Sequence, residues 1–168
     1  MLSVLIETKN DEEGLARTLA GLVPAAVEGV VREVIVCDRG STDKTHLVAE
    51  HAGCRFVADG GLVAGIRQAK CDWLLILPPG ARLAEGWIGS VMEHVAMSGA
   101  AARFSPLRGS GPSMLSRLFG RIRPLAYGLV ITKKEAAARA ARDGNAEAIA
   151  RKVSSRRLSA EISTMPSR

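Results

Sequence analysis

The sequence predicts an α/β fold in which a mostly parallel sheet carries helices on both faces. Short uncharged apolar runs recur along residues 1–100, and stretches with apolar residues at helical spacing separate them. The clearest run is Trp73–Leu77, which Pro78, Pro79 and Gly80 end abruptly. A short apolar run stopped by turn formers is typical of a strand buried on both faces.

The alternation continues from the N-terminus to residue 97. The expected strands are Ser3–Ile6, Val34–Cys37, Arg55–Val57 and Trp73–Leu77. The expected helices follow Asn10 up to Pro24, follow Asp43 up to His51, and cover Leu62–Lys70 and Glu85–Met97. Short connections between these elements favour right-handed crossovers and parallel strands.

After Gly99 the pattern weakens, and the C-terminal part is expected to be short and basic. We expect strands at Ala100–Phe104 and Leu129–Ile131, an amphipathic helix at Ser113–Arg123, and a helix capped by Thr132. The end of the chain beyond Ser154 is expected to be loose.

Length and composition are those of one globular domain: 168 residues, of which 47% are hydrophobic and 24% charged. No apolar run approaches the roughly 20 residues that span a bilayer, so we expect a cytoplasmic protein. The aromatic content of 4% disfavours a nucleic-acid binder that stacks bases on aromatic side chains. Three distant cysteines without a Cys-x-x-Cys pair are expected to be free, buried or partly buried thiols.

Charge is distributed unevenly along the chain. Residues 1–102 carry a net charge of −4 and residues 103–168 a net charge of +10. Such an asymmetry suggests an anionic partner for the basic part: a membrane surface, a phosphate-bearing substrate or nucleic acid. The short basic amphipathic stretch Met114–Arg123 could lie at the inner face of a membrane, or could pack its apolar side on the core.

Three segments of the sequence form a recognisable set: Ser3–Asn10, Val34–Asp43 and Gly65–Leu77. Together they resemble glycosyltransferase family 2, whose members have the GT-A fold, a Rossmann-like domain, and transfer a sugar from a nucleotide sugar. The resemblance implies that residues 1–132 form a nucleotide-sugar-binding domain with a shortened acceptor side at 103–132. Residues 133–168 are then a basic helical extension.

The resemblance also implies a site. Thr8 and Asn10 match the family's Pro-Thr-Tyr-Asn motif, while Glu7 replaces its proline and Lys9 its tyrosine. Asp38 matches a carboxylate that reads the base, and Arg39 replaces the residue after it. We therefore expect Thr8, Asn10, Asp38 and Arg39 to bind the nucleotide; a plain turn role for Asp38 is the alternative.

At the end of the central strand the family has Asp-x-Asp, which holds Mg²⁺ or Mn²⁺ against the diphosphate. Here Pro78, Pro79 and Gly80 occupy these positions, and their side chains cannot ligate a hard cation. We therefore expect no metal cofactor. Arg67 and Arg82 are instead expected to face the phosphates, since guanidinium groups can hold phosphate oxygens.

Two hypotheses follow. In the first, the protein binds a UDP-, GDP- or dTDP-linked sugar and transfers it weakly or not at all. No general base is evident, because Asp143, Glu147 and Glu161 are isolated in the C-terminal part. In the second, the chain is an inactive GT-A-like binding or regulatory module with a basic surface for an anionic partner.

Overall fold

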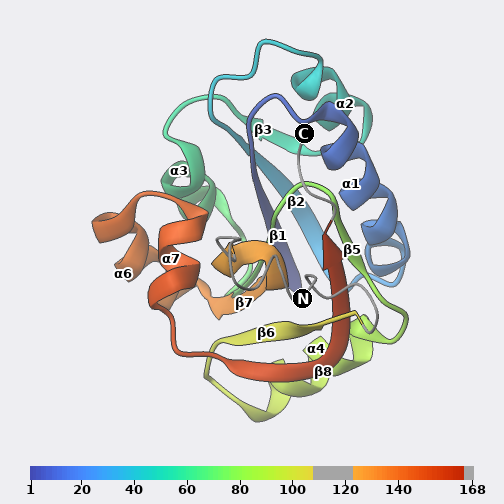
Figure 1. The fold of residues 1–168 in the computed structure, drawn as a ribbon, viewed down its shortest axis with the longest axis vertical. Coiled ribbons are helices and arrows are strands. Elements are labelled where there is room, and N and C mark those ends of the chain that lie inside the picture. Colours follow the sequence, from blue (N-terminus) through green and yellow to red (C-terminus); the bar gives the residue numbers. More distant parts are fainter. Residues whose placement is uncertain (108–122, 165–168) are drawn as a thin grey trace, which may run out of the picture.

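The computed structural model describes residues 1–107 and 123–164 (Figure 1). In chain order its strands are β1 (Leu2–Thr8), β2 (Val31–Asp38), β3 (Arg55–Val57), β4 (Trp73–Leu77), β5 (Ala81–Leu83), β6 (Ala102–Pro106), β7 (Leu129–Thr132) and β8 (Arg156–Thr164). Its helices are α1 (Glu12–Val27), α2 (Thr45–His51), α3 (Gly61–Gln68), α4 (Trp87–Met97), α6 (Lys133–Asp143) and α7 (Ala146–Lys152), with a 3₁₀ turn η1 (Pro124–Tyr127).

One sheet contains all eight described strands, in the order β3-β2-β1-β4-β7-β6-β8-β5. The strands β3, β2, β1 and β4 pair in parallel, and β6 pairs in parallel with β8. The pairs β4–β7, β6–β7 and β5–β8 are antiparallel. The prediction of an α/β fold with a mostly parallel sheet is confirmed.

Helices cover both faces of the sheet (Figure 1). On one face α1, α2 and α4 bury a core that includes Leu15, Val36 and Val91. On the other face α3, α6 and α7 pack on a second core that includes Leu5 and Ile66. Alternate residues of β1 supply the two cores, because successive side chains of a strand point to opposite faces.

The chain beyond Ser154 is not loose, so that prediction is wrong for the described residues. β8 lies between β6 and β5, and its Leu158, Ala160 and Ile162 are buried. Serine, glutamate and arginine stand between these apolar residues, so the segment has strand periodicity but a mainly polar composition. Neighbouring strands supply the contacts that its composition does not suggest.

Two other expectations have different outcomes. The three cysteines are free thiols, with Cys37 and Cys71 buried and Cys54 half-buried, as predicted. Burial raises the pKa of the Cys37 thiol to about 12.

The predicted helix at Ser113–Arg123, and with it the proposed membrane segment, lies almost entirely outside the described residues. Among the helices that the structure describes, none is long and apolar enough to cross a bilayer.

The helix α3 packs on the sheet through a glycine. A Cβ atom at Gly65 would lie 2.3 Å from Cys37 Sγ and 3.4 Å from a Leu5 methyl carbon. Both neighbours are fully buried, so neither can move without disturbing the core. Gly65 therefore sets how closely α3 approaches β1 and β2.

Gly65→Ala is expected to lower the free energy of unfolding by about 1–3 kcal/mol, the usual cost of overpacking a core. Urea denaturation measures this change. Gly89→Ala in α4 is the matched control, because a Cβ there meets no atom within 4 Å. The control is expected to be neutral or stabilising by up to about 1 kcal/mol, since alanine favours helix over glycine. Equal effects of the two substitutions would contradict the close packing.

Candidate functional site

The ends of β1 and β2 define a site at the carboxyl edge of the sheet. Thr8 and Asp38, the last residues of these strands, are paired in register. The chain leaves β1 toward β2 on one side, whereas β4 lies on its other side. In open α/β sheets such a switch in strand order opens a crevice in which ligands bind.

Asp38 shapes the loop that follows β2. Its side chain is buried, with 6% of the residue exposed. Oδ2 accepts hydrogen bonds from the backbone N–H groups of Gly40 at 3.0 Å and Ser41 at 2.8 Å, and Oδ1 accepts one from the Ser41 hydroxyl. The turn role considered as the alternative is therefore present in the structure, and this carboxylate orients residues 39–41 at the edge.

Asn10 joins the loop after β1 to the loop after β2. Its Oδ1 accepts the backbone N–H of Thr42 at 2.7 Å, and its own N–H donates to Ser41 Oγ at 2.9 Å. Asn10 has a φ of 51°, in the left-handed region that asparagine tolerates better than most residues. The residue thus serves both loops through its side chain and through its backbone conformation.

Further hydrogen bonds join the same two loops. Glu12 accepts the N–H of Lys44 at 2.9 Å, and Asp43 accepts the N–H of Glu12 at 3.4 Å. Asp43 also accepts the Thr45 hydroxyl at 2.6 Å, and this bond lowers the pKa of the Asp43 carboxyl. The segment Ser41–Asp43 therefore connects the two loops as well as leading into α2.

Thr8 lies at the centre of this edge. Its carbonyl accepts the N–H of Arg39 at 3.0 Å. Its hydroxyl is buried, with 2% of the residue exposed, and finds no hydrogen-bond partner within the described part of the chain. A buried hydroxyl without a partner is costly, so this group has unused hydrogen-bonding capacity beside the candidate site.

Glu7 is a site residue that the sequence analysis did not select. Its half-buried carboxylate accepts the N–H of Ala146 at 3.2 Å, at the start of α7, and lies beside Gly61 at the start of α3. Burial raises the pKa of this carboxyl, while Arg39 nearby lowers it and Glu147 raises it. The replacement of the family's proline by a carboxylate was the only signal in the sequence.

The raised pKa of Glu7 predicts how stability depends on pH. A carboxyl whose folded pKa exceeds its ordinary value of 4.5 binds more protons in the native state, so it lowers stability as pH rises through that interval. The free energy of unfolding of Glu7→Gln, minus that of the wild type, is expected to grow as pH rises above 4.5. Urea denaturation across this range tests it, and a difference that is constant or shrinks with pH contradicts the assignment.

The loop Pro78–Gly80 crosses the same edge. Gly80 has a φ of 82° and donates its N–H to the Gly14 carbonyl in α1 at 2.9 Å. Pro78 accepts the N–H of Ala81 at 3.3 Å through its carbonyl. Residues 78–80 thus offer backbone oxygens but no side-chain oxygen.

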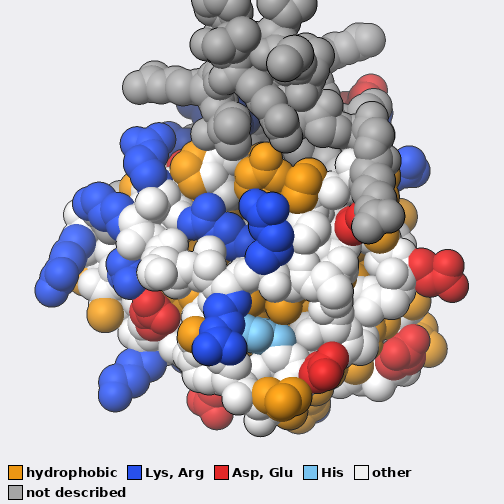
Figure 2. All heavy atoms as spheres, turned by 60° about the horizontal axis from the view of Figure 1, so that its bottom comes forward, with side chains coloured by type: hydrophobic (Ala, Val, Ile, Leu, Met, Phe, Trp, Pro, Cys, Tyr) orange, Lys and Arg blue, Asp and Glu red, His pale blue; other side chains and the backbone are white. Residues whose placement is uncertain are grey.

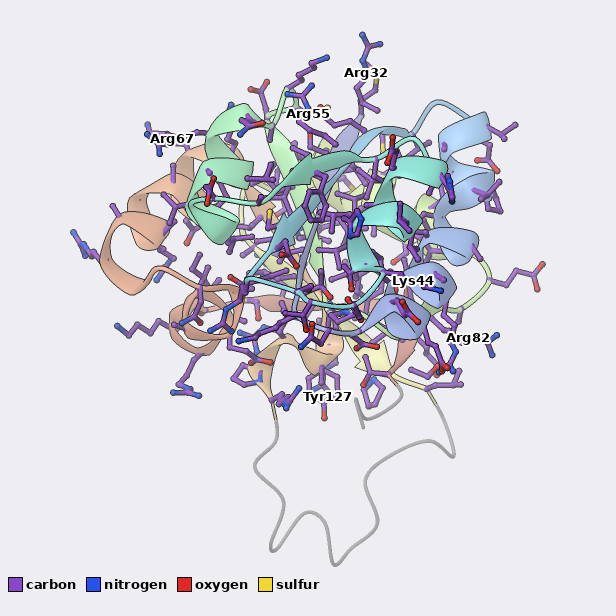
Figure 3. The ribbon with its side chains drawn as sticks, turned by 90° about the horizontal axis from the view of Figure 1, so that it is seen from above. Arg32, Lys44, Arg55, Arg67, Arg82 and Tyr127 are labelled. Carbon is purple, nitrogen blue, oxygen red and sulfur yellow. The ribbon has the colours of Figure 1, made fainter. Side chains whose placement is uncertain are left out.

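The structure does not bring the predicted arginines together. Arg39 is exposed at the edge and close enough to Glu7 to lower the pKa of that carboxyl. Arg67 and Arg82 lie on opposite sides of the molecule (Figure 3). Arg82 is exposed on β5, opposite Ser163 of β8.

Arg67 does not lie at the candidate site, contrary to the prediction that it faces the phosphates. α3 begins beside Glu7, and its last turn contains Arg67. The Arg67 carbonyl accepts from Lys133 Nζ, and the Lys133 N–H donates to Asp72, just before β4. Because the helix runs antiparallel to the strands, Arg67 lies at the amino edge of the sheet, away from the site.

Glu147 is not isolated, contrary to the expectation from the sequence. Its Oε2 accepts the N–H of Leu125 in η1 at 3.2 Å, and its charge acts on both Glu7 and Arg103. η1 in turn leads to Gly128, which packs against Leu77 at the end of β4. Glu7 and Glu147 therefore place two carboxylates near the ends of β1 and β4, where the sequence suggested none.

Comparisons with known proteins give the same fold. Glucosyl-3-phosphoglycerate synthase from Mycobacterium tuberculosis, in complex with Mn²⁺, UDP and phosphoglyceric acid, matches with a TM-score of 0.61 and 19% identity, over 80% of this chain and 56% of that one. The chain has the GT-A fold. A complex of that synthase with Mg²⁺ and UDP also gives a TM-score of 0.61 at 19% identity, over 80% of this chain and 57% of that one. A mycobacterial protein matches with a TM-score of 0.60 and 21% identity, over 80% of this chain and 54% of that one.

This GT-A chain spans little more than half the length of these neighbours. No protein-family model matches the sequence, and no curated protein does. The GT-A fold that the resemblance implied is thus confirmed by three-dimensional structure.

The expectation of no metal cofactor is contradicted by these neighbours, which hold Mn²⁺ or Mg²⁺ together with UDP. It rested on the side chains of residues 78–80 alone. Those side chains do not fit a hard cation, and the Asp38 oxygens already accept hydrogen bonds from residues 40 and 41. Side chains at this edge therefore do not form a ready set of ligands, whereas backbone carbonyls and the diphosphate oxygens of a bound nucleotide are the kind of oxygen that Mg²⁺ and Mn²⁺ take.

Proposed function

We propose that this protein binds a nucleotide-diphosphate sugar, linked to UDP, GDP or dTDP, at the carboxyl edge of β1, β2 and β4. The observation that carries the proposal is the pair of interlocked loops after β1 and β2. Asn10 and Asp38 hold these loops at the switch point of a GT-A fold whose neighbours bind UDP. In open α/β sheets, ligands bind in the crevice at this position.

The residues of the edge have distinct roles in this proposal. Asp38 and Asn10 preorganise the loops, so that little conformational entropy is lost when the nucleotide binds. Arg39 provides an exposed cation for the phosphates, and the unused hydroxyl of Thr8 provides a hydrogen bond after a small adjustment.

Sugar transfer is proposed to be slow. The loop that ends β4 contributes no carboxylate, and Glu7 and Glu147 are engaged with backbone N–H groups. Neither carboxylate is therefore free of backbone donors to take the proton of an acceptor hydroxyl. The same observation favours a second candidate function, a nucleotide-sugar-binding module without turnover.

Thermal unfolding in the presence of Mn²⁺ tests the binding proposal. A ligand at 100 times its Kd stabilises the folded state by about 2.7 kcal/mol. For a chain of this size that corresponds to a rise in Tm of roughly 5–10 °C. At least one of UDP-, GDP- and dTDP-linked sugars is expected to produce such a rise, and no rise with any of them contradicts the proposal.

Turnover separates the two candidates. The sugar nucleotide that binds is incubated with the protein, with and without added acceptor alcohols. Chromatography then measures the free nucleotide that transfer or hydrolysis releases. Slow release that Asp38→Ala removes indicates a glycosyltransferase. Binding without any release indicates the module.

A further inference from the structure

A group of exposed cations lies where α7 ends and β8 begins. Its members are Arg151, Lys152, Arg156 and Arg157, which we call the α7–β8 basic surface. All four residues are exposed. Figure 2 shows Lys and Arg side chains crowded over the left and centre of the face that carries β6 and β8, with Asp and Glu mostly toward its right side.

Backbone contacts hold these cations in one place. Arg103 of β6 donates to the carbonyls of Ala150 and Val153 and so ties the end of α7 to the sheet. Arg103 is also the ladder partner of Arg157, and the Arg156 N–H donates to the Ala101 carbonyl at 2.8 Å. The surface is therefore built from three elements that are fixed against one another.

Other residues neutralise the negative end of α7. Arg103 and Arg139 donate to the carbonyls of its last turn, with Arg139 Nη1 3.2 Å from the Lys152 carbonyl. These two side chains supply the positive charge that favours a helix C-terminus. The fold therefore does not require Arg156 and Arg157 for this purpose, and their charge is available to a ligand.

The α7–β8 basic surface is separate from the nucleotide site. β8 is parallel to β6, β6 is antiparallel to β7, and β7 is antiparallel to β4. β8 therefore runs in the same direction as β1 and β4, and the register places Arg156 level with Leu75 and Val4, in the middle of those strands. Three strands, β4, β7 and β6, lie between β8 and β1, so the basic surface is displaced sideways from the ends of β1 and β2.

The chemistry of the surroundings favours a lipid headgroup layer. Met97, which ends α4, is 80% exposed and stands four residues before Ala101, the hydrogen-bond partner of Arg156. One exposed apolar side chain near this group of cations in the sheet connections suits the interface of an anionic membrane. Among the described residues, the large exposed hydrophobic side chains include no aromatic one, which disfavours single-stranded nucleic acid.

We propose that the α7–β8 basic surface binds the anionic headgroups of a lipid membrane, independently of the nucleotide. Each basic residue near an anionic surface contributes about 1 kcal/mol, or roughly fivefold in binding. The whole basic part, residues 103–168, adds to this with its net charge of +10. The protein thus attaches peripherally with β6, β8 and the end of α7 toward the lipid.

Flotation with vesicles tests the proposal on the full chain. Vesicles of equal parts phosphatidylcholine and phosphatidylglycerol, at low salt, are expected to carry the wild type upward, and pure phosphatidylcholine vesicles are not. Arg156→Glu/Arg157→Glu is expected to weaken binding at least about tenfold. Raising the salt is expected to release the wild type, because exposed charges are screened.

The control reverses two cations at the other end of the same sheet. Arg32 of β2 and Arg55 of β3 are exposed strand residues, so Arg32→Glu/Arg55→Glu matches the change in residue type and net charge (Figure 3). The control also removes the ion pair at 3.6 Å between Arg55 and Glu33, whose side chain is 11% exposed, so Arg32→Gln/Arg55→Gln replaces the control if charge reversal unfolds it. Circular dichroism verifies that each variant is folded, and Arg156→Gln/Arg157→Gln replaces the test variant if the charge reversal unfolds it.

Equal weakening by the test and control variants overturns the proposal, because binding then depends on net charge alone. Failure of the wild type to float with anionic vesicles also overturns it. So does binding to duplex DNA, but not to vesicles, in the same buffer. Nucleotide affinity is expected to be unchanged in Arg156→Glu/Arg157→Glu, so failure here leaves the proposed function intact.

Discussion

Asp38→Ala is expected to weaken nucleotide-sugar binding at least tenfold and to destabilise the fold by about 2–4 kcal/mol. The substitution leaves the N–H groups of Gly40 and Ser41 and the Ser41 hydroxyl without their acceptor. Each of these bonds contributes on the order of 1 kcal/mol, and bonds to a charged acceptor contribute more. The loop that follows β2 then loses the conformation on which the proposed site depends.

Two controls separate the loop from simple loss of charge. Asp59→Ala removes an exposed carboxylate in the segment before α3 and is expected to change stability by less than about 0.5 kcal/mol. Asp38→Asn keeps one oxygen acceptor but turns an NH₂ group toward two donors. Its nucleotide-sugar affinity and its stability are therefore expected to lie between those of the wild type and of Asp38→Ala. Calorimetry and urea denaturation measure both quantities. Wild-type affinity in Asp38→Ala would remove this residue from the site.

Asn10→Val is expected to have the second-largest effect, a loss of roughly 3 kcal/mol in stability together with weaker nucleotide binding. Valine cannot accept the Thr42 N–H, which the Asn10 side chain accepts at 2.7 Å. A β-branched residue is also strained at a φ of 51°. Both effects act on the connection between the two loops.

Asn10→Gly separates the two causes. Glycine adopts positive φ without strain but has no side-chain acceptor, so this variant is expected to lose only about 1 kcal/mol. The difference between the two variants then measures backbone strain. Equal stabilities of Asn10→Val and Asn10→Gly would show that the backbone conformation carries no cost.

The parallel half of the sheet could be predicted from the sequence for a simple physical reason. β1, β2 and β4 are buried on both faces, so each is a continuous apolar run that turn residues end. β8 was missed because only alternate residues are buried and the others are polar. β5 has the exposed Arg82 between Ala81 and Leu83 and directly follows the turn formers Pro78–Gly80, so it shows no apolar run.

The site could be predicted only in part. Thr8, Asn10 and Asp38 end strands that are recognisable, so their meeting at one edge follows from strand direction. The contact between Glu7 and Ala146 joins residues 139 positions apart, and no local pattern contains it. The prediction for Arg67 failed because α3 runs from the carboxyl edge of the sheet to its amino edge, and Arg67 lies in its last turn. The type of the residue does not reveal at which end of the helix it lies.

The central claim is that a nucleotide-diphosphate sugar binds at the edge that Asp38 organises. Calorimetric titration of UDP-, GDP- and dTDP-linked sugars into wild type, Asp38→Ala and Asp59→Ala, with Mn²⁺ present throughout, tests it most directly. The account predicts saturable binding of at least one sugar nucleotide by wild type and Asp59→Ala, and binding at least tenfold weaker by Asp38→Ala. Absence of binding to the wild type, or equal affinity in all three proteins, would contradict it.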